Sequence, residues 1–171
     1  SFVSQTDIAE WRAAVRPGST RLLFAETPTN PLTEVCDIVA LAAIAHDAGA
    51  LLAVDNCFAT PVLQQPLALG ADLVIQSLHK TLPSLTQTAI LHLKSQILDA
   101  KKVEQYLSVY QSYSPSYILI ASMENCVRYM AEKGAGEMAR YGARLRELRE
   151  KLAKLKHFRL LKEKICGAAG V

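Results

Sequence analysis

The chain alternates short apolar runs with segments whose apolar residues recur at helical spacing. Three runs have the length of buried strands, at residues 21–26, 50–55 and 72–76. Each run is continuously apolar, as is typical of strands in a parallel sheet that is covered on both faces. A further run at 88–94 predicts a fourth strand, whose direction the pattern leaves open.

Apolar positions at helical spacing predict helices between and after these strands. The first helix follows Thr6-Asp7 and ends at Pro17-Gly18. The second is expected over 34–48, with Thr33 as its N-cap and Gly49 at its C-terminal end. Beyond residue 97 the pattern is helical, and the predicted helices cover 97–110, 117–133 and a charged stretch near 136–156. This alternation predicts an α/β fold with three layers and a mainly parallel sheet.

The composition and charge pattern argue against a nucleic-acid-binding protein and against a membrane protein. Half of the 171 residues are hydrophobic and the net charge is +3. Basic residues gather between Arg140 and Lys164, but glutamates interleave with them, which favours a solvated helix face over a nucleic-acid site. No apolar run approaches the roughly 18 residues of a membrane span. We therefore expect neither a membrane nor a nucleic-acid partner.

The four cysteines are widely scattered and form no CxxC pair. This spacing favours reduced thiols in a cytoplasmic protein and argues against a metal site. The chain lacks an initiator methionine and ends in the apolar "ICGAAGV". We interpret the chain as a piece of a longer protein.

Polar side chains follow the ends of the three predicted parallel strands. Asn30 lies beyond the first, Asp55 closes the second, and Ser77, His79 and Lys80 follow the third. Ligands of open parallel sheets bind outside the carboxyl ends of the strands, so these residues are expected to converge. Any one of them alone is more simply explained as a turn cap or a solvent-facing group.

Together these residues match the chemistry of pyridoxal 5'-phosphate. A lysine of lowered pKa forms a Schiff base with an aldehyde, and Lys80 is the candidate catalytic residue. A carboxylate such as Asp55 can keep a pyridine nitrogen protonated. The Asn30 amide can bind a phenolic oxygen, and the Ser77 hydroxyl and His79 imidazole can hold a phosphate.

Residues 2–77 resemble the Cys/Met metabolism family of pyridoxal-phosphate enzymes, which includes cystathionine gamma-synthase and O-succinylhomoserine sulfhydrylase. The resemblance is carried by "RPGSTRLLFAETPTNPLTEVCDI" and "AIAHDAGALLAVDNCFATPVLQQPLALGADLVIQS". It implies that Asn30 binds the cofactor's ring oxygen and that Asp55 pairs with the pyridinium. It further implies an amino-acid substrate and gamma-replacement on an activated homoserine.

Residues 77–161 instead resemble the major domain of the ornithine/lysine/arginine decarboxylases. "SLHKTLPSLTQTAILHLK" and "YQSYSPSYILIASMENCVRYM" carry this likeness. It implies that Lys80 is the Schiff-base lysine, that Ser77 and His79 contact the phosphate, and that the reaction is decarboxylation of a basic amino acid. The two likenesses meet near residue 77, so the sequence predicts a chimera of two families with one fold type.

The resemblance also implies a domain division. Residues 1–156 correspond to a truncated large domain of the aspartate-aminotransferase-like (type I) fold, and 157–171 begin the small domain. A strand is expected to start at 157–161. Both families form homo-oligomers, so self-association is expected. Since the phosphate loop and most of the small domain are absent, a non-catalytic scaffold is a further alternative.

Overall fold

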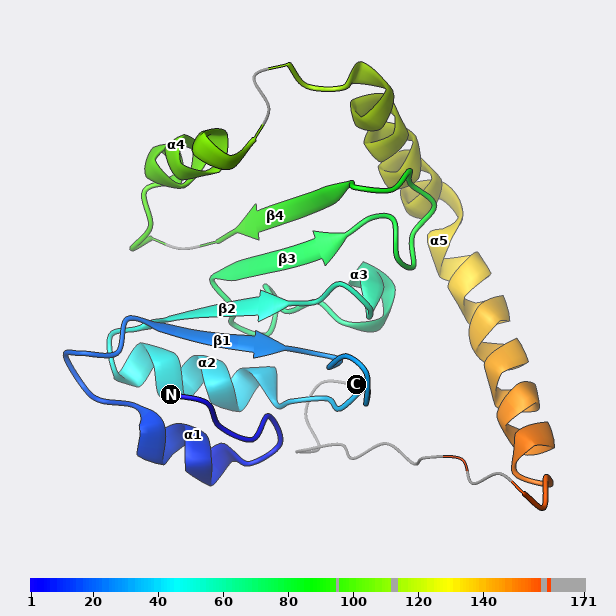
Figure 1. The fold of residues 1–171 in the computed structure, drawn as a ribbon, viewed down its shortest axis with the longest axis horizontal. Coiled ribbons are helices and arrows are strands. Elements are labelled where there is room, and N and C mark those ends of the chain that lie inside the picture. The colour runs from blue at the N-terminus through cyan, green and yellow to red at the C-terminus, as the bar shows by residue number, and fades with distance from the viewer. Residues whose placement is uncertain (95, 112–113, 158–159, 161–171) are drawn as a thin grey trace.

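The computed structural model describes residues 1–94, 96–111, 114–157 and 160. Its sheet contains β1 (Leu22–Glu26), β2 (Leu51–Asp55), β3 (Leu73–Ser77) and β4 (Ala89–Leu93), in that spatial order (Figure 1). β1, β2 and β3 are parallel, and β4 runs antiparallel to β3. The predicted α/β class and mainly parallel sheet are confirmed, and the direction of the fourth strand is now defined.

One face of the sheet packs against α1 (Ile8–Ala14) and α2 (Ile38–Asp47). Asp7 caps α1 by accepting hydrogen bonds from the amides of Ala9 and Glu10, as the sequence predicts for this position. The core between helices and sheet is formed by fully buried aliphatic side chains, among them Ile38, Leu41, Leu52, Val54 and Val74.

The expected start of the second helix at Thr33 is wrong. Asp37 is the N-cap of α2, and its carboxylate accepts from Ala40 N at 3.0 Å. The preceding residues are held instead by the loop after β1, since Cys36 N donates to Thr27 Oγ1 and Glu34 N donates to Thr29 Oγ1. These loop contacts divert the backbone amides that an earlier helical turn would need.

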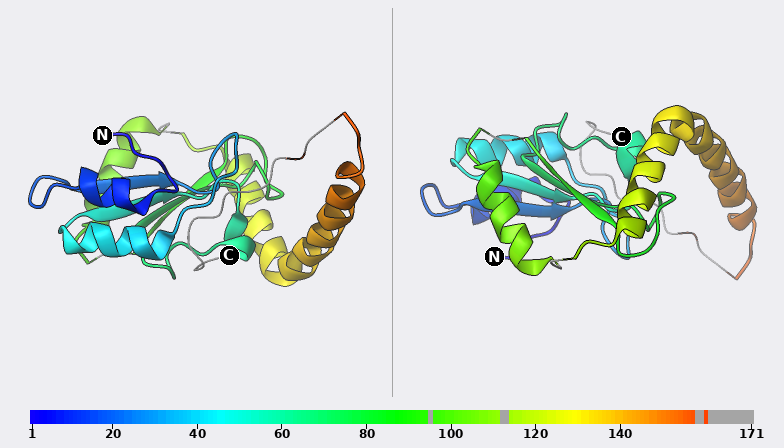
Figure 2. Two further views of the ribbon diagram at one scale, coloured as in Figure 1. Left: turned by 90° about the horizontal axis from the view of Figure 1, so that it is seen from below. Right: turned by 90° about the horizontal axis from the view of Figure 1, so that it is seen from above.

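The long C-terminal helix also differs from the prediction. The sequence predicts separate helices at 117–133 and 136–156. In the structure this stretch forms one continuous helix, α5 (Tyr117–Leu152). The Gly134-Ala135-Gly136 segment between them weakens a helix by about 1 kcal/mol per glycine without removing a backbone donor, as a proline would. Figures 1 and 2 show α5 at the end of the sheet to which the three parallel strands point.

The remaining helices are shorter. α3 (Thr60–Leu63) follows β2 and contacts α5, while α4 (Ala100–Tyr110) buries none of its residues. On β1, Leu22 and Phe24 are about half exposed, although the apolar run predicted cover on both faces. None of the described helices combines the length and apolar character needed to cross a membrane. The strand expected at 157–161 falls largely outside the described residues.

Candidate functional site

The carboxyl ends of β1, β2 and β3 lie at one edge of the sheet. In the parallel register Glu26 is opposite Asp55, and Asp55 is opposite Ile75. Ser77 lies two residues beyond Ile75 on the same strand, so Asp55 and Ser77 belong to adjacent strand ends. Lys80 follows Ser77 by three residues, and the topology therefore brings it to the same edge.

Asp55 is half-buried at this edge. Its Oδ1 accepts a hydrogen bond from Cys57 N at 3.0 Å, which fixes the turn after β2. The Cys57 side chain also interacts with this carboxylate. A carboxylate has about four lone-pair sites, so Asp55 keeps acceptor capacity for a ligand beyond its contacts with Cys57.

Cys57 connects the ends of β2 and β3. Its Sγ accepts hydrogen bonds from both the amide and the hydroxyl of Ser77, each at 3.2 Å. Burial raises the pKa of the Cys57 thiol, as does nearby Asp55, while the bonds from Ser77 act in the opposite direction. The thiol is therefore an uncharged acceptor that orients Ser77.

Lys80 extends from the turn after β3 and is exposed. Its Nζ lies 4.7 Å from the centroid of the Phe58 ring, a distance at which the ring attracts a cation. Thr81 Oγ1 donates to Cys57 O at 3.4 Å and ties the two turns together. Residues 57–58 after β2 thus contact residues 80–81 after β3, which places Lys80 on the Asp55 side of the edge.

His79 faces the loop that leads into β4. Its Nδ1 donates to Thr88 O at 3.0 Å, and the amide of Leu78 donates to the same carbonyl at 2.9 Å. The loop is also attached to α5, because Ser122 Oγ accepts from Leu85 N at 2.8 Å and lies 3.0 Å from Ser84 Oγ. His79 therefore stabilises this loop through Nδ1, and only Nε2 is left for other partners.

Asn30 is less closely integrated. It is exposed in the loop after β1, between two cis peptide bonds, Thr27–Pro28 and Asn30–Pro31. The loop reaches the site edge through Thr27 N, which donates to Asp55 O at 2.9 Å. Within the described part of the chain, no hydrogen bond joins the Asn30 side chain to Asp55, Ser77 or Lys80.

A buried residue that the sequence analysis did not select organises these strand ends. Asn56 is fully buried, and its Nδ2 donates to Thr27 O at 2.8 Å and to Gln64 Oε1 at 2.7 Å. Its Oδ1 accepts from Gln76 Nε2 at 3.1 Å. The signal in the sequence is an amide directly after Asp55, at the end of an otherwise apolar strand, where a buried amide needs several hydrogen-bond partners.

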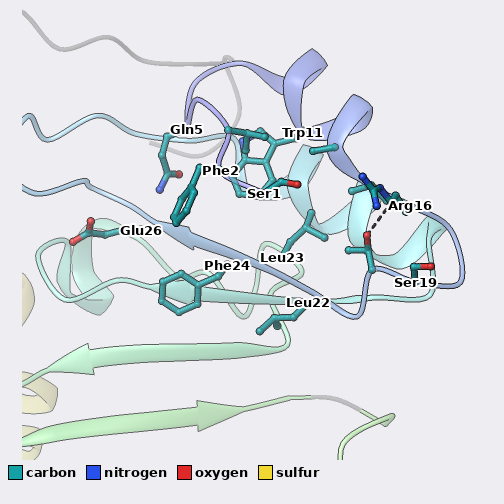
Figure 3. Close-up of a pocket in the computed structure, with 14 residues that line it drawn as sticks. Ser1, Phe2, Gln5, Trp11, Arg16, Ser19, Leu22, Leu23, Phe24 and Glu26 are labelled. Carbon is teal, nitrogen blue, oxygen red and sulfur yellow. Dashed lines mark hydrogen bonds between the residues drawn. The ribbon is translucent and has the colours of Figure 1, made fainter.

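Two cavities border the sheet. The larger, of about 770 Å³, runs along β1 beneath Trp11 and Phe2, and neither Asp55 nor Lys80 lines it (Figure 3). The second, of about 660 Å³, lies between Lys80, Phe58 and the α5 residues around Tyr141. No group of three or more His, Cys, Asp or Glu side chains within the described segments could hold a metal ion.

Residues 1–90 match the family described as "Cys/Met metabolism PLP-dependent enzyme". The chain belongs to this family. The match continues past Ser77 and Lys80, so it spans the point at which the sequence analysis placed a change of family. Nothing in the comparisons supports a decarboxylase segment or a chimera.

Several relatives are similar to somewhat less than half of the chain. O-succinylhomoserine sulfhydrylase of Pseudomonas aeruginosa is 64% identical over 75 residues, covering 44% of this chain and 18% of that protein. Cystathionine gamma-lyase of Bacillus subtilis is 49% identical over 82 residues, covering 48% and 21%. The chain thus spans about a fifth of the length of these curated relatives.

Solved structures show the same fold. A methionine gamma lyase from Micromonospora echinospora matches with a TM-score of 0.53 and 34% identity, covering 64% of this chain and 29% of that one. Cystathionine gamma-lyase from Lactobacillus plantarum matches with a TM-score of 0.53 and 32% identity, covering 64% and 28%. The sheet and its helices are therefore part of the fold of this enzyme family.

The donor set fits one end of pyridoxal phosphate better than the other. Asp55 offers a carboxylate with remaining acceptor capacity and Lys80 offers an amine that lies beside the Phe58 ring, so groups for the ring nitrogen and the aldehyde are present. Ser77 Oγ and His79 Nδ1 instead donate to Cys57 and Thr88. The Ser77 hydroxyl has only lone pairs left, and these cannot bind an anion. His79 still has its second ring nitrogen, Nε2, for a phosphate.

Proposed function

We propose that this chain is the cofactor-binding core of a pyridoxal-phosphate enzyme of sulfur amino-acid metabolism. The single observation that carries the proposal is that Asp55 and Lys80 follow neighbouring parallel strands and are joined through the contacts of Cys57, Phe58, Ser77 and Thr81. Membership of a PLP-dependent family, matched over both residues, supports the same assignment.

Each side chain has a distinct role in this proposal. Lys80 Nζ would hold the aldehyde group as an imine, with loss of water, and Phe58 provides an aromatic surface beside the amine. Asp55 would keep the ring nitrogen protonated, and the cofactor, when bound, would supply an electron sink for carbanion chemistry. Asn30 would bind the ring oxygen once its loop closes on the ligand, and His79 Nε2 and Ser77 would lie toward the phosphate.

The proposed substrate class follows from the named relatives. An O-succinylhomoserine sulfhydrylase and a cystathionine gamma-synthase are among the similar proteins, which favours an activated homoserine and gamma-replacement. The decarboxylase-like character of residues 77–161 remains the alternative. Residues 157–171 are proposed to begin the small domain.

We further propose that the complete protein is a cytoplasmic homo-oligomer. Apolar side chains on α5 such as Ile118 and Val127 are exposed, as expected where another subunit or domain packs. Light scattering of the purified chain tests self-association. A monomer at all concentrations would contradict it.

Titration of the full 171-residue chain with pyridoxal phosphate tests the cofactor site. We expect a visible absorbance band, and borohydride reduction followed by mass spectrometry should locate the adduct on Lys80. Lys80→Ala should abolish the band, and Asp55→Asn should weaken cofactor affinity about tenfold or more. Lys94→Ala is the matched control, because Lys94 follows β4 at the opposite end of the sheet.

A band that survives in Lys80→Ala would overturn the assignment of Lys80. The absence of any band in the wild-type chain would favour the non-catalytic scaffold. Addition of O-succinylhomoserine or of a basic amino acid distinguishes the two substrate classes, since only the accepted class should shift the spectrum of the bound cofactor.

A further inference from the structure

The cavity of about 660 Å³ beside Lys80 has walls from two parts of the chain. The turns after β2 and β3 contribute Phe58, Thr60, Lys80 and Thr81, and the middle of α5 contributes the opposite wall. The α5 wall is formed by successive turns of the helix, and its lining residues are Glu137, Met138, Arg140, Tyr141, Gly142, Arg144 and Leu145.

The charges in this cavity are unbalanced. Arg140 is paired with Glu137 one helical turn away. Arg144 and Lys80 have no carboxylate partner among the residues that the structure describes, although both line the same space. The one carboxylate in the lining, Glu137, is paired with Arg140, so Lys80 and Arg144 leave the cavity with an excess of positive charge that favours an anionic ligand.

The remaining lining defines the shape of that ligand. Phe58, Leu63, Met138 and Leu145 supply apolar surface, and Tyr141 adds a phenol that can donate a hydrogen bond. A ligand that suits this lining has a compact apolar or aromatic body and one anionic group. The guanidinium of Arg144 can bind a phosphate or a carboxylate through two parallel N–H donors.

We propose that Arg144 binds the anionic group of the ligand held at Lys80. This inference rests on the proposed cofactor role of Lys80, and it adds a binding residue from α5 that lies far from the strand ends in sequence. It also addresses the limited capacity of Ser77 and His79, whose hydrogen bonds to Cys57 and Thr88 leave the phosphate with few donors at the strand end itself. The anion is either the phosphate of the cofactor or the carboxylate of an amino-acid substrate.

Comparison of pyridoxal phosphate with pyridoxal separates the phosphate from the rest of the ligand. We expect Arg144→Ala to lower the affinity for pyridoxal phosphate about tenfold or more and to leave the affinity for pyridoxal unchanged. Arg144→Lys should keep part of the preference. Arg146→Ala is the matched control, because Arg146 is exposed on the same helix and does not line the cavity. Circular dichroism verifies that each variant keeps its helix.

Titrations without the cofactor separate this inference from the proposed function. Inorganic phosphate and succinate are added separately while the arginine side-chain Nε–H resonances are followed by NMR, with the Arg144 signal assigned from its absence in Arg144→Ala. A shift of that signal with phosphate, together with loss of the phosphate preference, identifies the cofactor's phosphate as the anion. A shift with succinate and an unchanged phosphate preference identifies the substrate carboxylate. If neither anion moves the signal and Arg144→Ala keeps the full phosphate preference, the inference is overturned even where Lys80 binds the cofactor.

Discussion

The Ser77 hydroxyl and Cys57 Sγ are 3.2 Å apart, and the Ser77 amide lies at the same distance from the same sulfur. One thiol therefore accepts two hydrogen bonds from a single residue of the neighbouring strand. The contact joins the turn that follows Asp55 to the strand that leads to Lys80, and it determines where the Ser77 hydroxyl points.

Replacement of Cys57 by alanine should destabilise the chain. Both Ser77 donors would lose their acceptor in a buried position, and we expect a loss of about 2 kcal/mol in the free energy of unfolding, measured by urea denaturation. Cys57→Ser keeps an acceptor and should lose less than half as much. Cys126→Ala, at another buried cysteine, controls for lost packing alone. Equal losses in Cys57→Ala and Cys57→Ser would show that the hydrogen bonds contribute nothing.

The buried thiols should make stability depend on alkaline pH. Burial raises the pKa values of Cys57 and Cys126, so the unfolded chain loses these protons at lower pH than the folded chain does. The contribution of the protonated thiols to the free energy of unfolding is therefore fully present below the unfolded thiol pKa of about 8.5. It is lost as the pH rises from there through the raised pKa values of the folded state. The fall is at most about 1.4 kcal/mol per pH unit for each thiol.

The measurement compares the wild-type chain with a Cys57→Ser, Cys126→Ser double variant between pH 7 and pH 10. The other titrating groups are common to both proteins, so the difference isolates the two thiols. The wild-type chain should lose more stability over this range. Parallel pH profiles would contradict the assignment of raised pKa values.

Asn56→Ala should be among the most destabilising single substitutions. It removes a fully buried amide whose partners are Thr27, Gln64 and Gln76, and it leaves buried polar atoms without partners. We expect a loss of about 3 kcal/mol or more in the free energy of unfolding. Gln65→Ala, at an exposed amide that donates only to Pro61 O, should change it by less than about 0.5 kcal/mol. Similar effects at the two positions would argue against the network.

Two glycines should respond oppositely to alanine. Gly70 has a φ of +105°, and a Cβ placed there would lie 2.8 Å from Ala42 Cβ, so Gly70→Ala should cost about 2 kcal/mol. Gly136 is in α5 with open space around its Cα, so Gly136→Ala should stabilise the chain by about 1 kcal/mol through helix propensity. Thermal unfolding of both variants tests the pair, and a destabilised Gly136→Ala would show that this part of α5 is not a regular helix in solution.

Hydrophobic patterning was sufficient to predict the sheet. The three parallel strands lie within one residue of the predicted runs, because a short run of apolar residues between turn residues has few alternatives. The same pattern could not show that the second helix begins after Asp37 and not after Thr33. The later helix start depends on hydrogen bonds that the amides of Glu34 and Cys36 donate to the hydroxyls of Thr29 and Thr27, and the sequence alone cannot identify these pairs.

The candidate site was predictable to a similar extent. Strand order alone brought Asp55 and Lys80 to one edge, since parallel strands place their carboxyl ends together. The partners of Ser77 and His79 were not predictable, because they depend on the turn after β2 and on the loop before β4. Arg144 also escaped notice. Its position depends on α5 being continuous through Gly134 and Gly136, where local propensity favours an interruption.

The continuity of α5 links two attachments to the edge of the sheet. Near one end, Ser122 bonds the loop that follows Lys80, and farther along, Arg144 faces the cavity beside Lys80. The two residues are 22 positions apart, about six helical turns, and the helix curves between them without an interruption (Figure 2). The direction in which Arg144 faces is consequently set by the helical repeat, so a single inserted residue would rotate Arg144 by about 100° away from the cavity.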